Sequence, residues 1–189
     1  MRHKYDTQGI VLSRTHVGEA HTLVTSLTSD LGLVRVRAQS VRKPSAKLAS
    51  ALTTLAESQL MLVRGKEGWR LAGAVLRKSW FARLSSYTAR LVAGRVSGLV
   101  LRLVVGETQD ANLFPILRGL FSALSELPEK DHEAAEILAV VRILSVLGLD
   151  TGAIPGEWGA YTSDLLETIM QERPSYIYRI NTGIIASGL

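Results

Sequence analysis

The sequence predicts an α+β fold: a small antiparallel β-barrel over residues 1–80, followed by an all-α helical domain over residues 81–189. Short apolar segments with alternating polar residues fill the first part, whereas apolar residues at three- and four-residue spacing fill the second. The charge divides at the same place. Residues 1–80 hold 13 Lys and Arg against 5 Asp and Glu, and residues 81–189 hold 9 against 12. This asymmetry favours a nucleic-acid-binding module carried on a second domain.

The predicted strands follow one another without room for parallel crossovers. They cover residues 8–13, 21–28, 33–38, 58–64 and 69–76. Asp30-Leu31-Gly32 predicts a tight turn, and Gly65-Lys66-Glu67-Gly68 a four-residue hairpin loop. Within residues 33–38, valines alternate with Arg35 and Arg37, which places two guanidinium groups on the outer face of the strand. Five strands in about 80 residues fit an OB-fold.

Helical spacing begins after residue 80. The predicted helices cover residues 81–105, 110–127, 131–147, 164–173 and 177–189. Asp110 is suited to cap the second helix, and Pro128 to end it. Gly148 lies where the third helix is expected to stop, and Pro174 directly after the fourth.

A cluster of cations is the sharpest local feature of the chain. Val41-Arg42-Lys43-Pro44-Ser45-Ala46-Lys47 places three cations beside a proline, downstream of Arg35 and Arg37. This pattern predicts a strand and loop that follow a phosphate backbone, with little sequence preference because aromatic residues are few here. A solvated basic surface without a partner is the alternative interpretation. The predicted nucleic-acid-binding residues are Lys4, Arg14, Arg35, Arg37, Arg42, Lys43, Lys47, Arg64 and Lys66.

No catalytic centre, metal site or cofactor is predicted. The chain has no cysteine, which removes disulfides and thiolate zinc sites. His16, Glu19 and His21 span a predicted turn and lack a fourth ligand. No catalytic triad, carboxylate pair or phosphate-cradling loop stands out. Residues 99–105, the most apolar stretch, are too short to span a membrane, and no signal-peptide core follows the N-terminus, so we expect a cytoplasmic protein.

Several spaced residue groups of the chain form one pattern. They are Tyr5-x-Thr7-x-Gly9-Ile10-Val11-Leu12, Gly18-Glu19, Thr28-x-x-x-Gly32-Leu33, Ala38-x-x-x-Arg42-Lys43-x-x-x-Lys47-Leu48 and, more weakly, Val141-Arg142-Ile143-Leu144-x-x-Leu147-Gly148. In these positions the chain resembles the RecO family of recombination mediators. The resemblance implies an N-terminal OB-fold and a C-terminal helical domain. It also implies binding of single- and double-stranded DNA, annealing of complementary strands, cooperation with RecR, displacement of single-strand-binding protein (SSB) and help in loading RecA.

The sequence departs from that family in one segment. Many members carry a four-cysteine zinc site after the position of Gly148, and this chain has no cysteine, so no zinc is expected. The chain is also shorter than the typical member. Contacts that family members make through the C-terminal region beyond the length of this chain are therefore not carried over. The resemblance further implies that the helical domain receives the acidic, apolar C-terminal tail of SSB. Arg118 and Arg142 are the residues predicted to pair with its carboxylate.

The leading function is therefore a non-enzymatic DNA-binding recombination mediator in DNA repair. Two alternatives come from other classes of protein. One is an RNA-binding OB-fold protein of translation or RNA handling, and the other is a non-catalytic interaction scaffold whose basic barrel binds an acidic partner. Strand-annealing activity separates the first function from the other two, since neither of them needs it.

Overall fold

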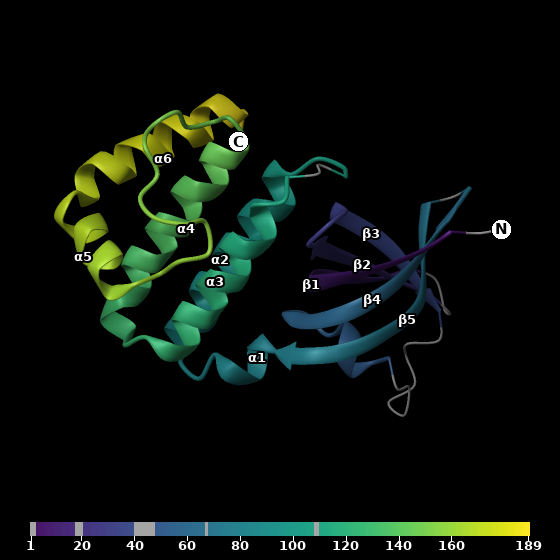
Figure 1. Cartoon of the computed structure of the whole chain (residues 1–189). Helices are drawn as coiled ribbons and strands as arrows, with labels where there is room; N and C mark the ends of the chain where they lie inside the picture. The colour runs from purple at the N-terminus through teal and green to yellow at the C-terminus, as the bar shows by residue number, and fades with distance from the viewer. Residues whose placement is uncertain (1–2, 18–20, 40–47, 67, 108–109) are drawn as a thin grey trace. The chain divides into compact units, whose positions relative to one another are not determined.

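The chain forms two compact units. The barrel unit comprises Met1–Arg83 together with Val105–Phe114, and the helical unit comprises Leu84–Val104 together with Pro115–Leu189. The sequence predicted one boundary after residue 80, whereas the barrel unit continues to Arg83 and regains a segment from beyond the first long helix. The computed structural model, drawn in Figure 1, describes residues 3–17, 21–39, 48–66, 68–107 and 110–189.

The described part of the barrel unit contains five strands. They close into a barrel in the order β1-β2-β3-β5-β4. Neighbouring strands are antiparallel except β3 and β5, which run parallel. This topology confirms the predicted α+β fold with an N-terminal OB-fold. The strands are β1 (Lys4–Val17), β2 (His21–Thr28), β3 (Gly32–Gln39), β4 (Ala56–Gly65) and β5 (Gly68–Ser79).

The first strand is longer than the sequence predicted because it closes both sides of the barrel. Residues 4–10 pair with β4, and residues 9–17 pair with β2. The register with β2 shifts between Val11 and Ser13. Such a bulge bends a strand, which lets one segment serve two neighbours. Polar residues occupy both ends of β1, so apolar alternation alone predicts a shorter strand.

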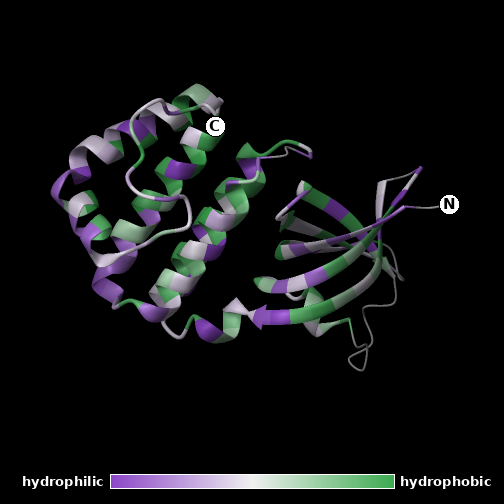
Figure 2. Ribbon diagram, viewed as in Figure 1, coloured by the Kyte–Doolittle hydropathy of each residue, from purple (hydrophilic) through white to green (hydrophobic). Residues whose placement is uncertain are grey.

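The barrel core consists of side chains that alternate inward from all five strands. Trp69 is the largest of them and is 6% exposed. Along β5 the ribbon is hydrophobic through its middle and hydrophilic at its C-terminal end (Figure 2). The main cluster contains Val11, Val24, Val34, Val36, Ala38, Leu60, Leu62 and Trp69 from the strands, and Leu52 from a short 3-10 helix (Ser50–Leu52) between β3 and β4.

Residues that carry the family resemblance meet at the turn between β2 and β3. Thr7 donates a hydrogen bond to Asp30 Oδ2 at 2.8 Å, and Ser29 donates to the same oxygen at 2.6 Å. Thr28 donates to the Gly32 carbonyl at 2.8 Å. The hydrogen bonds from Ser29 and then Thr7 lower the pKa of the Asp30 carboxyl, because they stabilise its charged form. The matched threonines therefore hold the turn that sets the register of β2 and β3.

The helical unit is organised around one buried helix. In α4 (His132–Val146), residues 137–144 are all buried, and the helix packs against α2, α5 and α6. Within the ranges the structure describes, no helix combines the length and the apolar character needed to cross a membrane. The other α-helices of the described residues are α2 (Tyr87–Leu103), α3 (Leu113–Glu126), α5 (Ser163–Gln171) and α6 (Arg173–Ser187), together with the short α1 (Trp80–Arg83), which belongs to the barrel unit.

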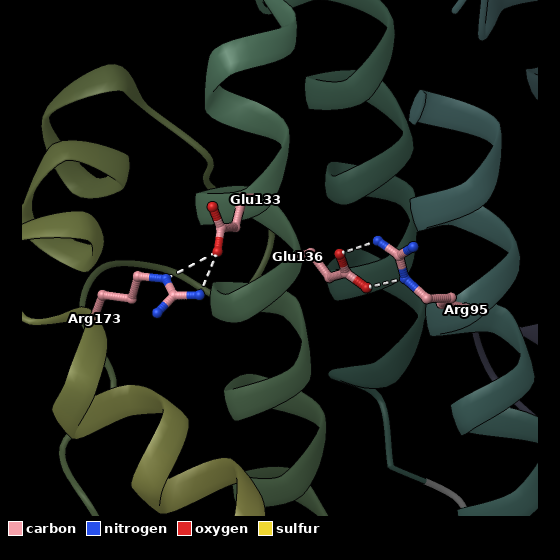
Figure 3. Close-up of polar contacts among 4 residues, drawn as sticks. All are labelled: Arg95, Glu133, Glu136 and Arg173. Carbon is pink, nitrogen blue, oxygen red and sulfur yellow. Dashed lines mark hydrogen bonds and ion pairs between the residues drawn. The ribbon is translucent and has the colours of Figure 1, made fainter. Parts of the chain in front are cut away.

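Two ion pairs join α4 to its neighbours. Arg95 on α2 forms a two-point contact with Glu136, in which Nε and one terminal nitrogen donate at 2.7 and 2.5 Å (Figure 3). Arg173 on α6 donates to Glu133 at 2.8 Å. Both glutamates lie in the first turns of α4. Two of the carboxylates of the helical unit are therefore paired with arginines of the same unit.

Two helix boundaries differ from the prediction. Residues 81–105 form two helices instead of one, because the chain becomes extended at Ser86, whose side chain caps α2 by accepting from the Ala89 amide at 3.0 Å. Pro174 was expected to follow a helix, and instead it occupies the first turn of α6. Proline is tolerated there because the amide hydrogen that it lacks has no partner in a first turn.

Candidate nucleic-acid interface

The outer face of β3 presents two guanidinium groups. Arg35 and Arg37 are exposed, whereas Val34, Val36 and Ala38 between and beside them are buried. The strand alternation that the sequence predicted is therefore present. Side chains two residues apart on one strand face share a side, so both arginines lie on the solvent side of β3.

Pairing across the barrel brings cations from other strands into line with Arg37. In the parallel β3–β5 pair, Arg37 lies beside Arg70. Arg70 pairs with Val63 of β4, which in turn pairs with Lys4 of β1. Lys4, Arg37 and Arg70 are all exposed. We call these three residues the cationic row, because they follow one transverse line over the outer face of four adjacent strands.

A shallow depression lies at the part of this row that Lys4 and Arg70 form. Its volume is about 300 Å³, and Lys4, Val63, Arg70 and Leu71 line it. Two cations beside two aliphatic side chains suit a ligand that carries negative charge and some apolar surface, as a nucleotide does. Neighbouring strands are about 4.8 Å apart, so the row extends over about 14 Å, the scale of a few nucleotides.

The hairpin between β4 and β5 carries two more of the predicted cations. Gly65 pairs directly with Gly68, so the connection is tighter than the predicted four-residue loop. Lys66 lies in this connection and is exposed. Arg64, the next-to-last residue of β4, forms an ion pair with Glu107 and stacks over the Trp69 ring, with Cζ 4.8 Å from the ring centroid. Its charge is therefore already matched by a carboxylate.

The remaining predicted cations divide into two groups. Arg14 is half-buried and pairs with Val24 across β1 and β2, away from the cationic row in the strand register. Arg42, Lys43 and Lys47 lie outside the described residues. The structure thus places Lys4 and Arg37 at the two ends of the cationic row, and it leaves the cluster at residues 42–47 a prediction.

Arg70 is the residue that the sequence reading missed. Its alternation with Trp69 and Leu71 already indicated an outward side chain on a strand. What the sequence did not show was the strand beside it, because the parallel β3–β5 contact joins segments more than 30 residues apart. Tyr5 and Trp69, two of the few aromatic residues in this part of the chain, contact each other edge to face with centroids 5.0 Å apart.

Charge is unevenly shared between the two units. The barrel unit holds 14 Lys and Arg against 7 Asp and Glu, whereas the helical unit holds 8 against 10. The barrel unit therefore attracts polyanions over a longer range than any single contact, and the attraction weakens as salt is added.

The structure argues against the partner-binding role predicted for Arg142. This side chain is fully buried. Its guanidinium donates to the carbonyls of Pro155, Trp158 and Ala160 at 2.8, 3.1 and 2.7 Å, and Cζ lies 5.0 Å from the Tyr161 ring centroid. Burial lowers the pKa of the Arg142 guanidinium and raises that of the Tyr161 hydroxyl. Arg142 organises the segment after α4 from within, where an incoming carboxylate does not reach it.

Arg118, the second residue predicted to receive a partner, is exposed on α3. Leu117 and Phe121, on the same helix, are fully buried in the core of the helical unit. Their apolar surface is therefore not available to a partner. The partner-binding role of Arg118 stays a prediction.

No donor set for a metal is present in the segment that follows α4. The chain has no thiolate to offer there, and the carbonyls of that segment accept hydrogen bonds from Arg142. Across the described ranges, no group of three or more His, Asp or Glu side chains is placed to hold a metal ion. The residues present therefore do not fit a four-cysteine zinc centre.

Comparison with known proteins gives one family and a set of relatives. Residues 1–80 match the family described as Recombination protein O N terminal. Proteins named DNA repair protein RecO are similar to this chain. That of Cyanothece sp. is 31% identical over 150 residues, which cover 79% of this chain and 51% of the relative. That of Heliobacterium modesticaldum is 33% identical over 175 residues, covering 85% and 62%. The chain spans about half the length of the curated relatives it matches.

Proposed function

The chain belongs to the RecO family, and from this premise we propose that it serves DNA repair and recombination as a non-enzymatic DNA-binding protein. The observation that supports the proposal is the cationic row over β1, β5 and β3, which lies within the matched N-terminal part. The finer function that we propose is binding of single- and double-stranded DNA and annealing of complementary strands.

The cationic row supports annealing for an electrostatic reason. Two complementary strands repel each other through their phosphates until base pairing begins. Lys4, Arg37 and Arg70 neutralise phosphates without contacting bases, so a bound strand keeps its base edges available to the second strand. Release of counterions supplies the binding free energy, which makes the interaction independent of sequence and sensitive to salt.

The family membership also supports partners in the recombination machinery. We propose that the chain cooperates with RecR, that it meets the acidic C-terminal tail of SSB, and that these contacts assist the loading of RecA. With Arg142 buried, Arg118 on α3 is the remaining cation among the two predicted for the tail. These partner contacts rest on the family and not on a pocket seen in the helical unit.

Strand annealing is the experiment that tests the proposal. Complementary fluorescent oligonucleotides are mixed with the full chain, with and without prior coating by SSB, and duplex formation is followed in time. We expect the wild-type protein to accelerate annealing, and Arg70→Ala and Lys4→Ala to slow it several-fold. Lys130→Ala is the matched control, because it removes one exposed positive charge from the helical unit.

The alternatives predict different results in the same assay. An RNA-binding protein of translation or RNA handling would bind RNA oligonucleotides much more tightly than DNA and would leave DNA annealing unchanged. An interaction scaffold would show no acceleration on either nucleic acid. Equal rates with and without the protein at low salt would overturn the proposed function.

A further inference from the structure

Glu107 fills an anion site that the barrel unit builds at the end of β4 and the start of β5. Its Oε1 accepts a hydrogen bond from Trp69 Nε1 at 2.9 Å, and the same oxygen accepts from the Arg64 guanidinium. Glu107 belongs to the segment 105–114, which is part of the barrel unit although it follows α2 in the sequence. Two donors from the barrel thus converge on one carboxylate oxygen.

The donors at this site are of the kind that binds phosphate. A guanidinium presents several N–H groups in a fixed plane, and an indole N–H can only donate. The planar Arg64 group is held in place by stacking on the Trp69 ring, which itself meets the Tyr5 ring edge to face. Such a preorganised pair of donors suits a phosphate oxygen as well as it suits the carboxylate that now occupies it.

Further cations lie at the same end of β4 as this site. Arg64 follows Val63, the residue that pairs with Lys4, so the Arg64 side chain faces the opposite side of the strand from the cationic row. Lys66 lies two residues further along the chain. The Arg64 and Glu107 side chains are 49% and 43% exposed, so solvent and ligands reach the pair. An ion pair this exposed is held weakly and opens readily.

We propose that Arg64 and Trp69 form a phosphate-binding position for nucleic acid, and that Glu107 occupies it in the free protein and is displaced when a nucleic-acid phosphate binds. Glu107 then acts as an intramolecular competitor that lowers affinity and rejects weakly bound anions. The inference rests on the proposed function, because it assumes that the barrel unit binds nucleic acid.

A double-mutant cycle on the full chain tests the competition. Binding of a fluorescent single-stranded DNA oligonucleotide is measured by anisotropy for the wild type, Glu107→Gln, Arg64→Ala and the double variant. Glutamine keeps an acceptor for Trp69 while removing the charge that holds Arg64. We expect Glu107→Gln to bind about 2- to 5-fold more tightly, the factor that an exposed ion pair withholds from a competing anion. In the Arg64→Ala background the same substitution should give no such gain.

Asp110→Asn is the matched control for long-range charge. It removes one carboxylate from the same segment, and Asp110 Oδ1 accepts from the Asn112 amide rather than from a cation. A gain for Glu107→Gln that equals the gain for Asp110→Asn, or that persists in Arg64→Ala, would overturn the inference while the proposed function stands. Absence of salt-dependent DNA binding by the wild type would instead overturn the proposed function, and this inference with it.

Discussion

At the scale of single residues, polar side chains in both units hold loops in place instead of facing a ligand. Arg142 was predicted to contact a partner at the surface, and instead it donates hydrogen bonds to several carbonyls of the segment after α4. Asp30 was predicted only as part of a turn, and its carboxylate collects two hydroxyl donors. In both cases a single group satisfies several partners, so replacing it leaves more than one of them unpaired.

Replacing Arg142 by methionine should destabilise the protein strongly. Methionine preserves much of the buried volume but leaves the carbonyls of Pro155, Trp158 and Ala160 without their donor. We expect the free energy of unfolding to fall by on the order of 3 kcal/mol in urea titrations. Arg102→Met, at an exposed position of α2, is the control and should change it by less than about 0.5 kcal/mol. Similar midpoints for the two variants would contradict the structural role of Arg142.

Asp30 gives the stability of the protein a dependence on acid. Because its pKa is lowered in the folded state, Asp30 contributes stability that is present above its unfolded pKa of about 3.9 and is lost as the pH falls through the folded value. Asp30→Asn removes this contribution. The difference in thermal midpoint between wild type and Asp30→Asn should be full at pH 7 and shrink below about pH 4. A difference that stays constant from pH 7 to pH 3 would show that the Asp30 charge contributes nothing.

At the scale of elements, the sequence predicted what alternation and spacing determine locally. Arg35 and Arg37 were placed correctly because strand alternation depends only on neighbouring residues. Arg70 was missed because its neighbour on β3 is set by a long-range parallel pairing of only two register positions. Pro174 was predicted to follow a helix and lies in the first turn of the next one, because proline is tolerated at both positions. Features that depend on neighbouring residues could be predicted from the sequence, whereas contacts between distant segments could not.

Two glycines on helices should respond to alanine in opposite directions. Gly119 on α3 lies against the segment after α4, and a Cβ there would come within 2.3 Å of the Gly159 carbonyl oxygen. Gly119→Ala should therefore lower the free energy of unfolding by about 1 to 3 kcal/mol, the usual cost of overpacking. A Cβ added to Gly94 on α2 would meet no atom within 4 Å other than those of its chain neighbours and of the backbone of its own helix. Gly94→Ala should therefore raise the free energy of unfolding by up to about 1 kcal/mol, because alanine has the higher helix propensity. Chemical denaturation of both variants measures the two changes in the free energy of unfolding. Changes of the same sign would contradict the prediction.

At the scale of the whole molecule, the two units differ in the sign of their net charge, and DNA binding should follow the barrel unit. Affinity for single-stranded DNA is expected to fall steeply with salt. Engagement of about four to six phosphates gives a slope of about −3 to −4 for the logarithm of the affinity against the logarithm of the salt concentration. Anisotropy titrations from 50 to 300 mM NaCl measure it, and Arg70→Ala should make the slope shallower by about 0.7. A slope near zero would contradict electrostatic binding.

The return of residues 105–114 to the barrel unit has a consequence for how the protein is made. The chain leaves that unit after Arg83 and rejoins it only after α2 has been synthesised. Glu107, the acceptor for the Trp69 indole, emerges from the ribosome 38 residues after its partner. At about 5 to 20 residues per second, the nascent barrel waits about 2 to 8 seconds with that donor unpaired. Completion of the N-terminal unit is therefore tied to translation of the second, and a fragment that stops at Arg83 would lack a native part of its own structure.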